Sequence, residues 1–394
     1  MPTPETRTGL VIYGATGYTG RQIAELAAQR WAQQPARRPG ALWMQPPLLA
    51  GRDVEKLRPF AESLGLPCEA VALDDRTRLD AVLSQRAFVI NAAGPFSATA
   101  EALAKACVRT RTHYLDVSGE FGSFRRVDDL NVDATQFGVL LMPGAGFVVA
   151  ASDFLLAEIR DAMPDVRTVR VAVSKPSRLS RGSLATLLET TREGVAVRRA
   201  GGLTTVPVGQ LERAFVFADE DFGPPVLCAA VQLPDLASAQ VTARTVENVE
   251  TYAEADTLRR LWFQVTGVAA MGLQFDSVKR ALRSQIARLP DTTTLSDQGS
   301  ARQIFVVEGE DPYGALTLRA RFEAADTYAF TAWSAVTLAE CAAERLRRTS
   351  ALPAGFRTPA GVFHEEFREA LRTCDCAMVS PLRAFGLGAR RARR

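Results

Sequence analysis

Three glycines with the spacing GxxGxxG, Gly14, Gly17 and Gly20, lie near the start of the 394-residue chain. Glycine has no Cβ, so such a turn lets backbone N–H groups approach a ligand, and the positive end of a following helix favours an anion there. The triplet alone is weak evidence, but it has the context that a dinucleotide-binding turn needs. We expect the anion to be a dinucleotide pyrophosphate, with a purely structural turn as the alternative.

That context is a strand before the glycines and a helix after them. Residues 10–13 are an apolar, partly β-branched run typical of a buried parallel strand. Ile23, Leu26 and Ala27 then recur at helical spacing. The pattern therefore predicts the first strand and helix of a nucleotide-binding domain.

The end of a second predicted strand, residues 47–50, bears on the choice of cofactor. Arg52 follows this strand, at a place where an NAD-specific domain carries an Asp or Glu for the ribose hydroxyls. A guanidinium suits a 2′-phosphate instead, so Arg52 favours NADPH over NADH, with a solvated arginine in a turn as the alternative. Asp53 fits the cap of the next helix.

Two further strand ends carry polar or small residues. After a third strand, Asp74 could reach the adenine edge or cap the following helix, and the sequence does not separate these roles. A fourth strand over residues 87–91 is continuously apolar and ends in Asn91, which Gly94 and Pro95 follow. Ligands bind at the carboxyl ends of such strands, so these three residues are candidate walls of the nicotinamide-ribose site. A small-residue turn that only packs against its neighbours is the alternative.

A fifth strand and its exit, residues 112–120, hold side chains that could manage a proton. Tyr114, Asp116, Ser118 and Glu120 are the catalytic candidates, and His113 lies beside them on the opposite face of the strand. A polar strand exit bonded to its own loop is an equally good interpretation. Every tyrosine lacks a lysine four residues later, which disfavours Ser/Tyr/Lys chemistry.

The elements predict an α/β protein. Residues 1–150 alternate strands and helices, as in a Rossmann-type, doubly wound parallel sheet. Residues 151–350 lose this alternation and predict an α+β domain that holds the substrate, and residues 351–394 are a C-terminal segment with a basic tail. An alanine-rich helix over residues 326–347 is expected to be buried between the domains. Strands of the second domain are expected over residues 166–174, 213–218, 240–246, 303–310 and 315–322.

Composition excludes several classes of function. A formal charge of +3 gives no electrostatic reason for a nucleic-acid partner. Six scattered cysteines and only two histidines predict no metal site and reduced thiols in the cytoplasm. No uninterrupted apolar run of about 18 residues occurs, so no membrane-spanning segment is expected. The partner would be a small-molecule or acyl substrate, and a homodimer stays open.

The chain resembles the saccharopine dehydrogenase-like oxidoreductases, and within them the trans-acting enoyl reductases. The resemblance implies an NADP-binding Rossmann domain, a second α+β domain and nicotinamide redox chemistry. It places Thr16, Tyr18 and Thr19 beside the glycines in the cofactor site. The residues that carry it are those at 13–20, 51–52, 91–96, 114–120, 309–314 and 358–361.

One segment departs from the family pattern. Relatives commonly read Gly-Phe-Asp-Ser-Ile-Pro-Ser-Asp where this chain has residues 146–153, with Val148 in place of the Asp and Ala151 in place of the Pro. If that Asp positions a substrate or a proton in relatives, this protein acts on something more apolar or has lost the activity.

The leading hypothesis is an NADPH-dependent reductase that delivers hydride to an activated C=C bond of a lipid or polyketide-type substrate. An apolar cleft would suit such a substrate. One alternative is a C–N oxidoreductase of saccharopine-dehydrogenase type, whose substrate carboxylates would meet Arg181 or Arg244. Another is a non-catalytic NADPH-binding protein. The candidate lining of the apolar cleft is Phe147, Val148, Trp262 and Phe263.

Overall fold

The computed structural model describes residues 7–33, 40–175, 194–207, 209–219, 223–255 and 302–385, with residue 284 and the backbone of two short strands. The chain forms two compact units. Unit 1 comprises Met1–Ala150 and Tyr328–Cys374, and unit 2 comprises Ala151–Thr327 and Asp375–Arg394. This division differs from the sequence-based one, which placed residues 328–350 in the second domain.

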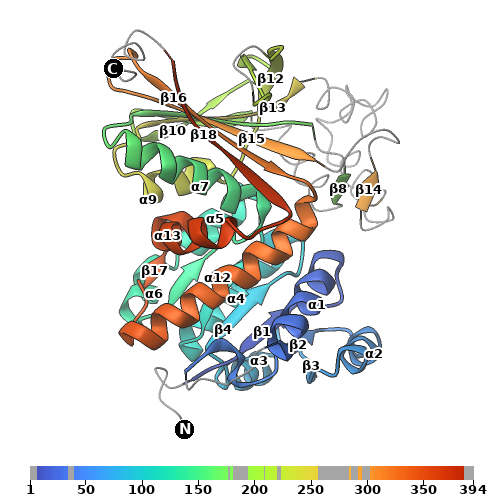
Figure 1. The fold of residues 1–394 in the computed structure, drawn as a ribbon. Helices are drawn as coiled ribbons and strands as arrows, with labels where there is room; N and C mark the ends of the chain where they lie inside the picture. Colours follow the sequence, from blue (N-terminus) through green and yellow to red (C-terminus); the bar gives the residue numbers. More distant parts are fainter. Residues whose placement is uncertain are drawn as a thin grey trace. The chain divides into compact units, whose positions relative to one another are not determined.

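Unit 1 is built on a seven-stranded sheet in the order β17-β6-β5-β4-β1-β2-β3, in which every neighbouring pair is parallel (Figure 1). The chain reverses its direction of winding between β1 and β4, which makes this pair the topological switch point where open α/β sheets bind ligands. The predicted Rossmann-type sheet is confirmed. The strands are β1 (Leu10–Tyr13), β2 (Leu48–Gly51), β3 (Cys68–Ala70), β4 (Phe88–Asn91), β5 (His113–Asp116), β6 (Leu140–Met142) and β17 (Gly355–Phe356).

Helices cover both faces of this sheet. On one face α3, α4 and α5 pack in succession. On the other, Arg21 of α1 lies over the Phe60 ring of α2, and Glu340 of α12 accepts a hydrogen bond from Arg30 of α1. The bounds are α1 (Tyr18–Ala32), α2 (Val54–Leu64), α3 (Arg76–Leu83), α4 (Phe96–Thr110), α5 (Phe121–Asp128), α6 (Asn131–Gln136), α12 (Thr327–Thr349) and α13 (Pro359–Leu371), with a 3-10 turn, η2, at Leu42–Met44.

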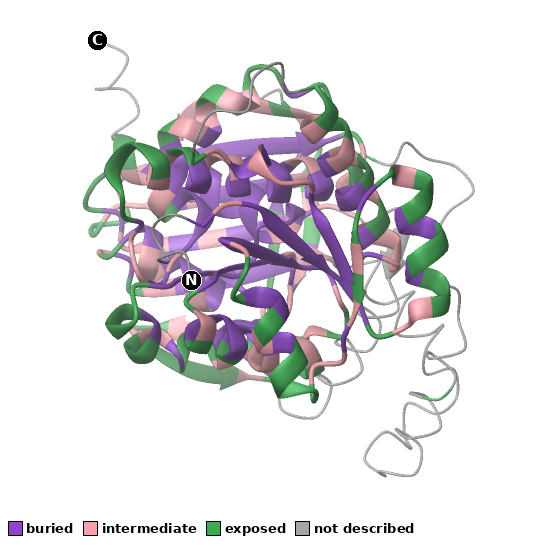
Figure 2. Cartoon of the chain, turned by 90° about the horizontal axis from the view of Figure 1, so that it is seen from below, coloured by how far each residue is buried: buried purple, intermediate pink, exposed green. Residues whose placement is uncertain are grey.

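The core of unit 1 lies between these helix layers and the sheet. All four residues of β1, β2, β4 and β5 are buried, which explains why these strands read as continuous apolar runs in the sequence. Figure 2 shows buried strands inside helices whose outer sides are exposed. The sequence pattern predicts one helix near residues 124–137, but the structure has two, α5 and α6, because the chain leaves helical geometry at Leu130.

Unit 2 holds a mixed nine-stranded sheet, as the α+β prediction required. Its central strands β13 and β7 are parallel and the other neighbours are antiparallel. A short separate pair joins β8 (Arg178–Ser180) to β14 (Thr292–Thr294). The strands of the large sheet are β7 (Thr168–Val173), β9 (Val195–Arg199), β10 (Gly202–Val206), β11 (Glu212–Phe215), β12 (Val226–Ala230), β13 (Asn248–Glu254), β15 (Gln303–Glu310), β16 (Thr317–Ala324) and β18 (Ala377–Phe385).

Two helices of unit 2 are described, α7 (Phe147–Ala162), which enters the unit at Ala151, and α9 (Asp235–Thr242). A Cβ on Gly309 of β15 would lie 2.4 Å from Ile159, so α7 rests directly on the sheet. The strand expected over residues 240–246 is wrong. Buried Leu236 and Ala239 recur at helical spacing, and this pattern begins before the alternation that suggested a strand. The sequence also predicts helices over residues 182–189, 255–265 and 277–287. Apart from Ala255 and Ser284, these lie outside the described residues.

His113 is a core residue of unit 1 and ties β5 to β6. Its Nδ1 accepts a hydrogen bond of 3.0 Å from the backbone N–H of Leu140. Burial, with a smaller contribution from the Arg7 charge, lowers the pKa of His113 to about 4. The ring is therefore neutral at physiological pH and acts as an acceptor.

This burial predicts a pH-dependent stability. The unfolded chain, with a pKa near 6.5 for this side chain, binds the proton more readily, so its contribution is present above that pH and is lost as the pH falls towards 4. His113→Asn keeps an acceptor for Leu140 but cannot be protonated. Between about pH 7 and pH 5, wild type should lose about 2 kcal/mol more free energy of unfolding than the variant. Denaturant unfolding at several pH values measures this, and parallel curves for the two proteins would contradict it.

Candidate functional site

The glycine turn joins β1 to α1 at the switch point of unit 1. Gly14 has φ of +84°, a conformation that L side chains rarely adopt. A Cβ on Gly14 would lie 2.6 Å from the backbone nitrogen of Ala93, which follows β4. The turn after β1 and the loop after β4 therefore touch backbone to backbone, and only glycine allows this approach.

The other two glycines have different surroundings. A Cβ on Gly20 would lie 2.1 Å from the carbonyl oxygen of Gly14, so α1 packs against the turn itself. At Gly17 the nearest atom to such a Cβ is the same oxygen, at 3.4 Å. Gly17 is the N-cap of α1 and offers no side-chain oxygen to the first-turn N–H groups. The start of α1 thus presents unsatisfied backbone donors of the kind that suit an anion, and it is called the anion cradle below. Half-buried Thr16, Tyr18 and Thr19 flank it.

Arg52 and Asp74 lie near the end of β1. Burial raises the pKa of the Tyr13 hydroxyl, the Arg52 charge lowers it and the Asp74 charge raises it, so both charges act on the last residue of β1. Both side chains are exposed. Within the part of the chain that the structure describes, no hydrogen bond or ion pair engages either one. They stand free beside the glycine turn.

The neighbouring carboxylates are used as helix caps. Asp53 accepts from the N–H of Lys56 at the start of α2, as expected, and the bonds to Lys56 lower the pKa of Asp53. At the start of α3 the cap is Asp75, which accepts from the N–H of Arg78 at 3.1 Å. The capping role that the sequence left open for Asp74 therefore falls to its neighbour.

Asn91, Tyr114 and Asp116 form a buried chain of hydrogen bonds. The Asn91 amide donates to the Tyr114 hydroxyl at 3.2 Å, and that hydroxyl donates to Asp116 Oδ2 at 2.7 Å. None of the three has exposed surface. Burial and the Asp116 charge raise the pKa of Tyr114 well above its ordinary value, so the hydroxyl stays protonated.

The ends of this chain bind backbone. Asn91 Oδ1 accepts from the N–H of Ala93 at 3.0 Å. Asp116 Oδ1 accepts from the N–H groups of Ser118 and Gly144, each at 2.9 Å. Burial raises the pKa of Asp116, while the bonds from Gly144, Ser118 and Tyr114 oppose that rise. The three side chains with the backbone N–H groups of Ala93, Ser118 and Gly144 are called the exit network below, because they join the exits of β4, β5 and β6.

Glu120 is the N-cap residue of α5, and its carboxylate reaches the start of α4. Its carboxylate accepts from the N–H groups of Phe96 and Ser97, at 3.2 and 2.9 Å, and from the Ser123 hydroxyl at 2.9 Å. Glu120 therefore supplies the anion at the N-terminus of α4 that α1 lacks. Gly94 and Pro95 immediately precede these donors, and a Cβ on Gly94 would meet no atom within 4 Å.

The loop after β6 is held by α12, which sequence reasoning did not connect with the site. The N–H of Phe147 donates to the Thr331 hydroxyl at 3.1 Å, and the Ser334 hydroxyl donates to the carbonyl of Ala145 at 2.7 Å. Tyr328 meets Tyr18 of the glycine turn edge to face, with ring centroids 4.8 Å apart. Local sequence patterns carry no signal for contacts between α12 and loops that lie so far from it along the chain.

Val148, the departure from the family pattern, is half-buried and contacts the loop after β5. A Cβ on Gly119 would lie 3.2 Å from Val148 Cγ2. Phe147, a candidate for an apolar lining, is buried against the Phe330 ring. Arg244 is exposed in unit 2 between α9 and β13. Arg181, Trp262 and Phe263 lie outside the described residues.

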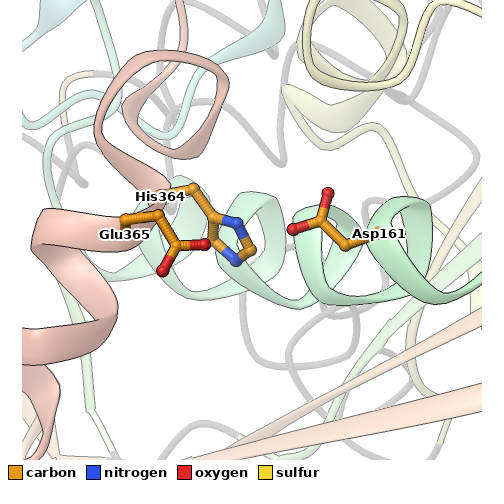
Figure 3. A group of neighbouring side chains, drawn as sticks. All are labelled: Asp161, His364 and Glu365. Carbon is orange, nitrogen blue, oxygen red and sulfur yellow. The ribbon is translucent and has the colours of Figure 1, made fainter.

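Potential metal ligands in the described ranges are divided between the two units. His364 and Glu365 lie on α13 of unit 1, whereas Asp161 lies on α7 of unit 2 (Figure 3). Glu365 is already paired with Arg368 at 2.8 Å. Within those ranges neither unit alone gathers three metal-ligating side chains. None of the helices there combines the length and apolar character needed to cross a bilayer.

Sequence comparisons agree with this geometry. Residues 10–136 match the family model of the saccharopine dehydrogenase NADP-binding domain. A mouse saccharopine dehydrogenase-like oxidoreductase is 27% identical over 180 residues, which are 41% of this chain and 40% of that protein. A trans-acting enoyl reductase of Mycobacterium leprae is 29% identical over 165 residues, 40% of this chain and 37% of that protein. The chain thus spans less than half of the length of these two relatives.

Solved structures extend the likeness to the whole fold. The apo saccharopine dehydrogenase (L-Glu forming) of Saccharomyces cerevisiae has a TM-score of 0.61 at 12% identity, covering 96% of this chain and all of that one. Homospermidine synthase of Legionella pneumophila, solved with NAD, has a TM-score of 0.58 at 10% identity, covering 96% and 91%. At such identities the likeness concerns the fold alone. The sequence matches confirm the predicted resemblance to the saccharopine dehydrogenase-like oxidoreductases.

Proposed function

We propose that the protein is an NADPH-dependent oxidoreductase that transfers hydride to an activated C=C bond. The observation that carries the proposal is the glycine turn at the switch point of unit 1. There α1 presents uncapped backbone donors beside Arg52, whose guanidinium has no hydrogen bond or ion pair among the described residues. The match of residues 10–136 to an NADP-binding domain supports the same cofactor.

The residues present fit a dinucleotide phosphate. The anion cradle at Gly17 would hold the pyrophosphate, with the backbone of residues 14–20 around it. Arg52, exposed and without an ion pair among the described residues, would bind the 2′-phosphate, and Asp74 would face the adenine side. Asn91, Gly94 and Pro95 would wall the nicotinamide-ribose side. NADPH supplies the hydride when it is bound.

The rest of the chemistry is one proton. Of the four residues that the sequence predicts to be catalytic, Tyr114 and Asp116 are buried in the exit network, and Glu120 caps α4. Ser118 is the fourth. A general acid has to reach the reacting atom within about 3 Å, directly or through one water. We therefore expect the proton to be delivered from Glu120 or from the loop beside Val148.

A C=C acceptor is favoured by Val148 and by the named relatives. An isopropyl group stands where relatives carry a carboxylate, which suits an apolar substrate such as an enoyl thioester or ester. The fold likeness to a saccharopine dehydrogenase keeps a C–N oxidoreductase as the second candidate. A non-catalytic NADPH-binding protein is the third. The cytoplasmic location and a homodimer stay predictions.

NADPH absorbance distinguishes these candidates. We expect oxidation of NADPH with enoyl thioesters or enoyl esters and none with imines. Turnover with imines only would favour the C–N oxidoreductase. Tight NADPH binding without turnover on any of these acceptors would favour the non-catalytic protein.

Replacing Arg52 tests the cofactor preference. Arg52→Ala removes a charge-assisted bond to the 2′-phosphate, so the Kd for NADPH should rise by about tenfold or more while that for NADH changes little. Arg58→Ala, an equally exposed arginine on α2, removes the same charge nearby and should leave both constants unchanged. Fluorescence titration measures all of them. Equal wild-type affinities for the two cofactors would refute the role of Arg52.

Two glycine variants separate ligand contact from packing. Gly17→Ala adds a Cβ with only ordinary contacts, so we expect a normal unfolding midpoint but nucleotide affinity lowered by about tenfold, because the methyl group enters the cradle. Gly20→Ala places a Cβ 2.1 Å from the Gly14 carbonyl and should destabilise the fold by about 2 kcal/mol or more. Thermal unfolding and NADPH titration of both variants check this. Unchanged binding by Gly17→Ala would argue against the cradle.

A further inference from the structure

The exit network joins three loops through one carboxylate. Asp116 ends β5, and its two oxygens accept from three donors, the N–H groups of Ser118 and Gly144 and the hydroxyl of Tyr114. The backbone carbonyl of the same residue accepts from the N–H of Ala145. One residue therefore fixes the starts of the loops after β5 and β6.

The third loop is joined through Tyr114. Its hydroxyl accepts from Asn91, whose own oxygen accepts from the N–H of Ala93. Ala93 is the residue that the glycine turn touches. The loops after β4, β5 and β6 thus share one buried set of bonds, which ends at the turn after β1.

These loops lie along the carboxyl edge of the sheet on the β4 side of the switch point. Under the proposed function the adenine half of NADPH lies on the β2 side, near Arg52, and the nicotinamide half on the β4 side. Both Asp116 oxygens and the Tyr114 hydroxyl are engaged, and neither residue has exposed surface. Their geometry suits holding backbone better than contacting a substrate.

We propose that Asp116, acting with Tyr114, is a positioning residue that shapes the nicotinamide half of the cofactor site through the loops after β4, β5 and β6. This inference rests on the proposed function. It requires Asp116 as a hydrogen-bond acceptor and gives it no contact with the reacting atoms.

The test compares NADPH with 2′,5′-ADP, which has the adenine half and the 2′-phosphate but no nicotinamide. Asp116→Ala leaves three buried donors without an acceptor, so the Kd for NADPH should rise by about tenfold or more while that for 2′,5′-ADP changes less than about twofold. Asp116→Asn keeps an oxygen for both backbone N–H groups, so its Kd for NADPH should stay within about threefold of wild type.

Two further variants serve as an alternative test and as a control for general destabilisation. Tyr114→Phe removes only the hydroxyl and replaces Asp116→Ala as the test if that variant does not fold. Its Kd for NADPH should rise by about threefold or more, and its Kd for 2′,5′-ADP should not change. Leu103→Ala makes a cavity in the buried core of α4, outside the network, and should lower the unfolding midpoint without changing the ratio of the two constants.

Several outcomes would overturn the inference. One is a parallel rise of both constants in Asp116→Ala or Tyr114→Phe, which would mean a general structural role. Another is NADPH binding unchanged in both variants, and a third is Asp116→Asn as weak as Asp116→Ala. Wild type that binds 2′,5′-ADP but gains nothing from the nicotinamide half would also overturn it while leaving the nucleotide site intact. Wild type that binds neither ligand would overturn the proposed function as well.

Discussion

The arrangement of unit 1 depends on a close approach of backbone to backbone at the switch point. Gly14 is in contact with Ala93 after β4 on one side and with Gly20 of α1 on the other, at distances that exclude any side chain at either glycine. This packing brings the start of α1 up to the sheet edge with its N–H groups uncapped. The same missing Cβ atoms therefore allow the close helix packing and leave the N–H groups at the start of α1 open at the sheet edge.

Carboxylates cap several of the helices that start at the carboxyl edge of the unit 1 sheet. Capping carboxylates occupy the starts of α2, α3 and α4, from Asp53, Asp75 and Glu120, whereas α1 has none. A helix start without a capping carboxylate is a place at this edge where a ligand's phosphate can accept from the free N–H groups. Arg52 stands beside that place with no carboxylate partner among the described residues.

The site also draws on parts of the chain that are distant in sequence. β17 extends the parallel sheet beside β6, and Thr331 and Ser334 of α12 bind the loop after β6. At the end of β5, the buried carboxylate of Asp116 accepts from the loops after β5 and β6 and from the Tyr114 hydroxyl. The loops at this edge are held by buried polar bonds that lie within unit 1.

The sequence by itself determined the strand–turn–helix order of the first 150 residues, the glycine turn and the place of Arg52, because these follow from local periodicity and from the conformations open to glycine. It could not show whether Asp74 or Asp75 caps α3, nor whether Asp116 is catalytic or buried. Both questions depend on which backbone N–H groups lie next to each carboxylate in the folded chain. Only the tertiary structure showed that residues 328–374 belong to unit 1 and that α9 lies where a strand was expected. The first result comes from long-range packing, which leaves no periodic signal in a two-residue strand such as β17. The second comes from the helical spacing of Leu236 and Ala239, which begins before the alternation that suggested a strand.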